Sequence, residues 1–192
     1  MHEPERAVDV HIADSLSALE LEPVRAASCI ADLGSGAGLP GLPLAIALPH
    51  ARVALVESVR RKARLLGEAI DRLGLTNAAV VAARAEGWPA GLGAHDLVVA
   101  RALAAPEVVL EYGAPLLGLG GWLVAWRAGE RTEPDGVAEL LGLSLQERRR
   151  SRPYALARDL RLDVYRKVAP TPERFPRRPG VARRSPLRAA GA

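Results

Sequence analysis

A glycine-rich turn constrains the fold of this chain more than any other feature. Its residues, Asp32-Leu33-Gly34-Ser35-Gly36-Ala37-Gly38, follow an apolar run at 29–31 and lead into a helix-forming stretch at 40–48. A strand, a glycine turn and a helix in this order place backbone N–H groups at the carboxyl end of a parallel sheet, where open α/β sheets bind ligands. Glycines suit such a turn because a side chain would hold a ligand away from the backbone. The sequence therefore predicts an α/β fold with a ligand site at this turn.

The spacing of the glycines separates this turn from a dinucleotide-binding fingerprint. That fingerprint, G-x-G-x-x-G, would require glycine where Leu39 stands. Here the glycines fall as G-x-G-x-G, and Asp32 stands two residues before the first of them. This arrangement resembles the first motif of S-adenosylmethionine (SAM) methyltransferases. A tight glycine turn without a ligand is the alternative from the pattern alone.

An acidic residue ends the second predicted strand, residues 52–56. Glu57 follows the turn by about the twenty residues at which an acid meets a ribose in βαβ nucleotide sites. Its carboxylate can accept hydrogen bonds from both ribose hydroxyls. Taken alone, Glu57 is better explained as a solvated residue at a strand end. Together with the glycine turn, it predicts a cofactor that contains a nucleoside.

Composition limits the class of protein. A chain of 192 residues with 49% hydrophobic residues is long enough for one domain with a core of its own. Its apolar stretches are too short to span a membrane, and its polar N-terminus does not resemble a signal peptide. The single cysteine, Cys29, allows no internal disulfide, and no Cys/His cluster has the spacing of a metal site. We expect a cytoplasmic monomer without a metal.

Strand and helix patterns alternate along most of the chain. Helices are expected at 40–48, 60–73 and 107–117, and strands at 28–33, 52–56, 78–83, 96–100, 122–126, 143–149 and 160–167. These elements predict a doubly wound, mostly parallel seven-stranded sheet with an antiparallel edge. We assign residues 1–169 to this domain, with a short helical lead-in at 1–27. Residues 170–192 are a Pro/Arg-rich tail, for which no regular structure is expected.

Charge divides the chain into two unequal parts. Residues 148–192 contain fourteen Arg or Lys and three acidic residues, a net charge of +11, whereas the first 147 residues carry −7. A basic end on an acidic body is typical of a surface that binds a polyanion, and arginine both forks onto phosphates and stacks on bases. A solvated tail is one alternative. A tail that folds back over the acidic body and closes the cofactor site is another.

Several further motifs resemble the RsmG (GidB) family of 16S ribosomal RNA guanine-N7 methyltransferases. The resemblance covers nearly the whole chain, from about residue 11 to 187. It rests on His11-Ile12-Ala13-Asp14-Ser15-Leu16, the Gly-Leu-Pro-Gly-Leu-Pro of residues 38–43, Arg84-Ala85-Glu86, residues 96–102 with Arg101-Ala102, Arg158-Asp159-Leu160, and the tail at 171–180.

The resemblance implies a class I, Rossmann-like methyltransferase that uses SAM to methylate guanine N7 in 16S rRNA. The cofactor-binding residues that it and the turn imply are Gly34, Ser35, Gly36, Leu39, Glu57, Ala85, Glu86 and Arg101. Ala85 and Glu86 would flank the adenine, and Arg101 would lie beside the methionine end or the target base. A structural ion pair is the alternative for Arg101, and a capping turn for Glu86. The RNA-binding residues predicted in the tail are Arg174, Arg177 and Arg178.

No catalytic acid or base is predicted. Guanine N7 has a free lone pair, so in-line positioning of two bound partners is enough for methyl transfer. N7 faces the deep, narrow groove of an A-form helix, and the target should therefore lie in a loop or an opened strand. His11 and Asp14 stand three residues apart, so one helical face can carry both toward the cofactor pocket. A pair that caps or packs the helix is the alternative.

Three features depart from the family pattern. The helical segment that usually precedes the His-x-x-Asp-Ser motif does not appear between Met1 and His11, Val10 stands where arginine is usual, and Arg127-Ala128-Gly129 replaces a common Lys-Gly. Two other functions stay open from the sequence. One is a SAM methyltransferase with a small-molecule or protein substrate, which would not need the basic tail. The other is a non-catalytic RNA-binding protein.

Overall fold

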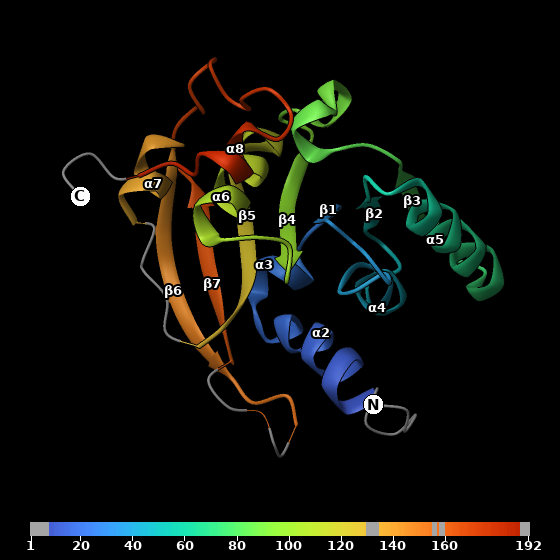
Figure 1. The fold of residues 1–192 in the computed structure, drawn as a ribbon. Coiled ribbons are helices and arrows are strands. Elements are labelled where there is room, and N and C mark those ends of the chain that lie inside the picture. The colour runs from blue at the N-terminus through green and yellow to red at the C-terminus, as the bar shows by residue number, and fades with distance from the viewer. Residues whose placement is uncertain (1–7, 130–134, 155–156, 158–159, 189–192) are drawn as a thin grey trace.

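Seven strands form a single sheet in the order β3-β2-β1-β4-β5-β7-β6 (Figure 1). The computed structural model describes residues 8–129, 135–154, 157 and 160–188. The five strands β3, β2, β1, β4 and β5 are parallel to one another, and β7 lies antiparallel between β5 and β6. This confirms the predicted doubly wound sheet with an antiparallel edge. The strands are β1 (Cys29–Leu33), β2 (Arg52–Val56), β3 (Ala78–Val81), β4 (His95–Arg101), β5 (Leu117–Ala128), β6 (Leu143–Ser151) and β7 (Leu160–Lys167).

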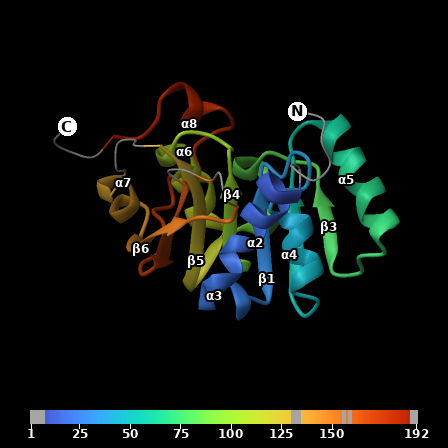
Figure 2. The ribbon, with the colours of Figure 1, turned by 90° about the horizontal axis from the view of Figure 1, so that it is seen from below.

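Helices cover both faces of the sheet. The lead-in is a run of short helical turns, η1 (Val8–Ala13), α2 (Asp14–Leu16), η2 (Ser17–Glu20) and α3 (Glu22–Arg25). The later helices are α4 (Gly41–Ala47), α5 (Arg60–Leu73), α6 (Pro106–Gly113), α7 (Asp135–Leu140) and α8 (Val181–Arg184), with shorter turns η3 (Ala85–Gly87), η4 (Pro89–Gly91) and η5 (Ala114–Leu116). Figure 2 shows α6 beside α8, and α2 beside α4, as their contacts also indicate.

The core consists of two apolar clusters, one on each face of the sheet. Residues of the lead-in, α4 and α5 pack against one face, where Leu55, Leu97 and Val99 are fully or almost fully buried. Residues of α6, α7 and the tail pack against the other face, around Leu123 and Tyr165. Because the parallel strands are covered on both sides, they read as nearly continuous apolar runs in the sequence.

The start of β5 differs from the expectation. A helix was expected at 107–117 and a strand at 122–126, yet α6 ends at Gly113 and β5 begins at Leu117. Gly118, Gly120 and Gly121 therefore lie inside the strand. A Cβ on Gly121 would lie 3.0 Å from the Gly118 carbonyl oxygen and 3.2 Å from that of Asp96. The pairing of β4 with β5 also shifts register between His95 and Leu97. The glycines therefore allow the backbone of β5 to approach the backbone of β4 closely where their pairing is irregular.

The tail also differs from the expectation. It contains α8, and its residues Phe175 and Ala182 are 7% and 2% exposed within the core cluster on the α6 side. The expectation of no regular structure was wrong because isolated apolar residues between prolines and arginines carry no period. Their burial depends on the surface of α6, which lies far away in the sequence. Arg158 and Asp159 fall outside the described residues.

Two glycines should respond in opposite directions to alanine. A Cβ on Gly41 would lie 2.2 Å from Leu55 Cδ2 and 2.6 Å from Asp32 Oδ2, whereas one on Gly67, inside α5, meets nothing within 4 Å. Gly41→Ala should lower the free energy of unfolding by about 1–3 kcal/mol through overpacking. Gly67→Ala should raise it by about 0.5–1 kcal/mol, because alanine loses less backbone entropy in a helix. Urea unfolding of both variants measures this, and equal effects would contradict the packing seen at Gly41.

Candidate cofactor and substrate site

The end of β2 holds the glycine turn after β1. The Val56 carbonyl oxygen accepts hydrogen bonds from the N–H groups of Gly34 (2.8 Å) and Ser35 (3.2 Å). The N–H of Gly36 donates to Glu57 Oε2 at 3.1 Å. Gly34 and Gly36 have φ angles of 67° and 57°, in the left-handed region that favours glycine. The turn is thus fixed against the neighbouring strand. It lies at the carboxyl end of a parallel strand, as the sequence predicted.

Asp32 supports the turn from inside the protein. Its side chain is fully buried, Oδ2 accepts a hydrogen bond from the Gly41 N–H at 3.0 Å, and its carbonyl oxygen accepts one from Ser35 Oγ at 2.9 Å. Burial raises the pKa of Asp32 to about 7. Ser35 is itself 1% exposed. Both side chains therefore stabilise the turn from beneath.

A cavity of about 410 Å³ opens above the turn, within the size range of small-molecule sites. Five of the predicted cofactor-binding residues line it: Gly34, Gly36, Glu57, Ala85 and Glu86. The three other predicted residues, Ser35, Leu39 and Arg101, lie in the described part of the chain but are not among its lining residues. The sequence did not predict further lining residues on several elements: Val59, Lys62, Leu103, Tyr112 and Arg183 among them.

Glu57 has the geometry that a ribose-binding carboxylate needs. It is 6% exposed; Oε1 accepts the Val59 N–H at 2.7 Å, and Oε2 accepts the Gly36 N–H at 3.1 Å. Each carboxylate oxygen has two lone-pair positions. One position on each oxygen therefore stays available for a ribose hydroxyl, while the backbone bonds keep the carboxylate in place.

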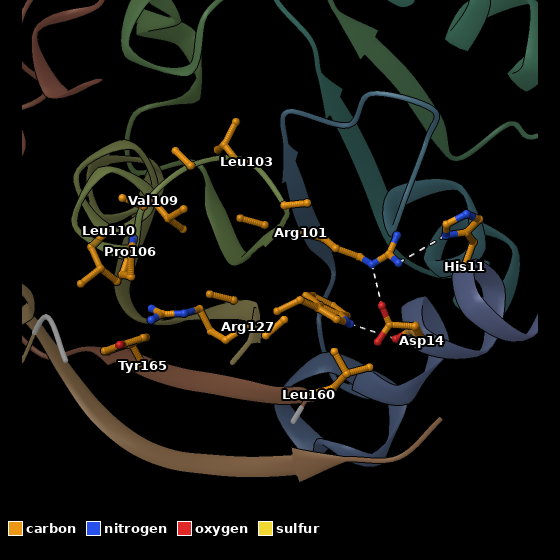
Figure 3. A pocket seen from close by; sticks show the side chains of 17 residues that line it. His11, Asp14, Arg101, Leu103, Pro106, Val109, Leu110, Arg127, Leu160 and Tyr165 are labelled. Atoms are coloured by element: carbon orange, nitrogen blue, oxygen red, sulfur yellow. Dashed lines mark hydrogen bonds and ion pairs between the residues drawn. The ribbon is translucent and has the colours of Figure 1, made fainter. Parts of the chain in front are cut away.

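A second cavity, of about 680 Å³, lies at the carboxyl ends of β4 and β5 (Figure 3). On its wall, Arg101 Nε donates to Asp14 Oδ2 at 2.6 Å, and Arg101 Nη2 lies 3.5 Å from His11 Nδ1. Arg101 Nη2 also donates to the Val10 carbonyl at 3.2 Å, and Trp126 Nε1 donates to that of Asp14 at 2.9 Å. The structural ion pair considered for Arg101 is therefore present, and it fastens the lead-in to β4.

The two cavities share one wall. Ala102 and Leu103, directly after β4, line both of them. Ala102 has a φ of 54°, which strains a residue with a side chain. Leu103 approaches the turn so closely that a Cβ on Gly34 would lie 2.5 Å from its Cδ1. The two cavities thus adjoin each other at Ala102 and Leu103.

The tail folds over the first cavity. The Gly180 N–H donates to Glu86 Oε1 at 2.9 Å, and Arg183 Nη2 donates to the Leu103 carbonyl at 3.0 Å. Arg177 Nε and Nη2 donate to the two carboxylate oxygens of Glu111, at 2.8 and 2.5 Å. The tail thus folds back over the body of the protein, as the second alternative for it required, and Arg183 lines the first cavity. No sequence motif indicated Glu111, which lies among apolar residues of α6.

The other predicted tail residues face solvent. Arg174 and Arg178 are exposed, and the Arg174 guanidinium lies 5.2 Å from the ring of Phe175.

Within the cavity wall, burial raises the pKa of Tyr112, whose phenol faces the Glu86 carboxylate and Arg183. Tyr112 could not be found from the sequence, because it sits among the apolar residues of a buried helix.

Comparison with known proteins identifies the family. The model of the family described as rRNA small subunit methyltransferase G matches residues 1–139. The chain belongs to this family. It is 43% identical to the ribosomal RNA small subunit methyltransferase G of Rubrobacter xylanophilus, over 98% of this chain and 76% of that protein. It is 41% identical to the same-named protein of Pelotomaculum thermopropionicum, over 95% and 80%.

The fold agrees with this assignment. A SAM-dependent methyltransferase from Aquifex aeolicus superposes with a TM-score of 0.65 at 16% identity, over 85% of this chain and 92% of that one. The chain thus has the fold of SAM-dependent methyltransferases. Its first cavity fits that cofactor, because glycines form its floor and the buried Glu57 carboxylate keeps lone pairs available. In the described part of the chain, no helix is long and apolar enough to cross a membrane.

Glu57→Ala should weaken SAM binding at least about tenfold. The variant removes two charge-assisted hydrogen bonds to the ribose, each worth roughly 1.5–3 kcal/mol, where 1.4 kcal/mol corresponds to a factor of ten. It also frees the Gly36 N–H. Calorimetric titration with SAM measures the affinity, and Glu68→Ala, an exposed acid on α5, controls for the loss of charge. An affinity within twofold of the wild type would show that Glu57 does not bind the ribose.

Arg177→Gln should lower SAM affinity, whereas Arg178→Gln should not. Glu111 is 1% exposed, so it depends on Arg177 as its buried partner, and losing that pair loosens the tail over Glu86 and Leu103. A decrease of about fivefold corresponds to roughly one net hydrogen bond, on the order of 1 kcal/mol. Arg178 is the matched control, because it is adjacent and exposed. Equal SAM affinity in both variants would contradict a role of the tail in the cofactor site.

Proposed function

We propose that this chain transfers a methyl group from SAM to N7 of a guanine in 16S ribosomal RNA. The observation that carries the proposal is the pair of cavities that meet at Ala102 and Leu103. The first cavity contains the residues that fit SAM. The second, larger cavity lies next to it at the carboxyl ends of β4 and β5, where a target base could enter. The names of the relatives support small-subunit rRNA as the substrate.

The chemistry asks mainly for positioning. SAM supplies an electrophilic methyl group, and guanine N7 attacks with a lone pair that carries no proton. No general base is therefore required, and orientation of the two partners supplies the rate enhancement. Three titratable side chains on the wall of the second cavity agree with this, because Arg101 binds Asp14 and contacts His11 in a structural cluster. In this proposal Arg101 positions the lead-in and borders the target base.

RNA contact extends beyond the cavities. Arg174 and Arg178 are exposed and basic, and we assign them to phosphate contacts of the RNA. Arg177 can contribute only the part of its guanidinium that Glu111 leaves accessible, since its side chain is 24% exposed. An opened RNA strand is the expected target, because N7 is inaccessible in an A-form helix. A ribosomal substrate also implies action in the bacterial cytoplasm.

Purified small ribosomal subunits from a strain that lacks this activity should be methylated once, at guanine N7. The assay uses isotopically labelled SAM, and mass spectrometry of the digested nucleosides identifies 7-methylguanosine. Glu57→Ala should abolish incorporation at low SAM concentrations. Label in another nucleoside would overturn the N7 assignment. Label in protein or small molecules, but not in RNA, would favour the alternative substrates.

A further inference from the structure

A row of arginines crosses the antiparallel end of the sheet. Arg127 of β5 is directly opposite Arg161 of β7, and Arg161 is directly opposite Arg150 of β6. Residues directly opposite each other in antiparallel strands project from the same face, so the three side chains share one face of the sheet. Like charges in such positions destabilise a sheet. The row is therefore a cost to stability unless it binds negative charge.

One buried carboxylate of the chain supplies negative charge to this row. Asp163, two residues along β7, is fully buried; Arg161 Nε lies 2.9 Å from its Oδ1, and Arg127 Nη1 lies 3.6 Å from its Oδ2. Arg148 stands directly opposite Asp163 and so belongs to the same face. Asp163 is thus bound by Arg161 and Arg127, and Arg148 and Arg150 lie on the same face of the edge strand β6.

Arg127 connects this row to the second cavity. Its side chain is 9% exposed and lines the cavity, as Figure 3 shows. Its Nη2 is buried, and within the described residues it has no hydrogen-bond acceptor. A buried guanidinium N–H without an acceptor costs free energy, which an anionic oxygen in the cavity would recover. Arg148 and Arg150, by contrast, are exposed at the edge strand.

We propose that this row binds the phosphates of the RNA strand around the target nucleotide. Arg127 binds a phosphate within the second cavity, and Arg150 and Arg148 bind the adjoining backbone at the edge of the sheet. The row spans two strand spacings, on the order of 10 Å, within reach of successive phosphates. Arginine forks onto phosphate through two N–H groups, which suits an RNA strand that is held in one register. The inference rests on the proposed function, because it takes RNA as the substrate.

The next residue on the same strand provides a matched control. Arg149 lies between Arg148 and Arg150 but projects from the opposite face, where its guanidinium contacts Glu20 of the lead-in. Arg149→Gln and Arg150→Gln therefore remove the same charge from neighbouring positions of one strand. Neither residue is deeply buried, so both variants should fold.

Arg150→Gln should weaken binding to small ribosomal subunits, and Arg149→Gln should not. Loss of one single-strand phosphate contact should lower the slope of log affinity against log salt concentration by about 0.7. SAM affinity should stay at the wild-type value in both. Arg127→Lys, which keeps the charge beside Asp163 but loses the fork, should raise KM for the subunits without changing SAM affinity.

Two measurements separate failure of this inference from failure of the proposed function. Direct binding to subunits reports on the arginine row, and methyl incorporation reports on the activity. If the wild type methylates the subunits while Arg150→Gln matches Arg149→Gln in affinity and salt slope, the row does not bind RNA. If Arg150→Gln lowers the salt slope as expected but the wild type transfers no methyl group, the arginine row binds RNA and the proposed reaction is wrong.

Discussion

Hydrogen bonds from the end of β2 hold the turn after β1, and the rest of the site is built on that contact. Val56 and Glu57 accept the N–H groups of Gly34, Ser35 and Gly36, across 21 residues of sequence in the case of Gly36. Parallel pairing of β1 with β2 brings the two segments to the same edge of the sheet. The floor of the cofactor cavity and its carboxylate are therefore fixed relative to each other by the fold. Such preorganisation reduces the entropy that a ligand must lose on binding.

Contacts between segments that are distant in the sequence form the rest of the two cavities. Asp14 and Arg101 are 87 residues apart, and Glu86 and Gly180 are 94 apart, yet each pair forms a direct hydrogen bond at a cavity. The first pair attaches the lead-in to the second cavity, and the other attaches the tail to the first. Since the Asp14 side chain is nearly buried, breaking its contact with Arg101 would leave a costly unpaired charge. The Glu86 side chain is also nearly buried, and it accepts the Gly180 N–H beside its ion pair with Arg84. The lead-in and the tail thus belong to the candidate site as much as the central sheet does.

Local patterns predicted the elements whose signals are local. Strand β2, helix α5 and strand β7 have the bounds that the sequence patterns predicted. The glycine turn and Glu57 were also found, because their spacing along the sequence is itself the signal. Residues whose position depends on tertiary packing could not be found: Tyr112 and Arg183 on the cavity wall have no motif of their own. Ser35 belongs to the motif, but its hydroxyl is turned inward to Asp32.

The basic segment contains two kinds of arginine, which contribute equally to the net charge but differ in their contacts with buried acids. The charge of +11 on residues 148–192 includes Arg161 and Arg177, whose guanidinium groups are bound to the buried acids Asp163 and Glu111. These pairs hold β7 and the tail in place, and each guanidinium is needed to neutralise the buried carboxylate that it binds. Arg150, Arg174 and Arg178 are exposed, so they can exchange counterions for phosphates at little structural cost. One basic segment can therefore contain arginines that stabilise the fold and arginines that are available to the substrate. The two kinds are distinguished by whether the arginine binds a buried acid or is exposed to solvent.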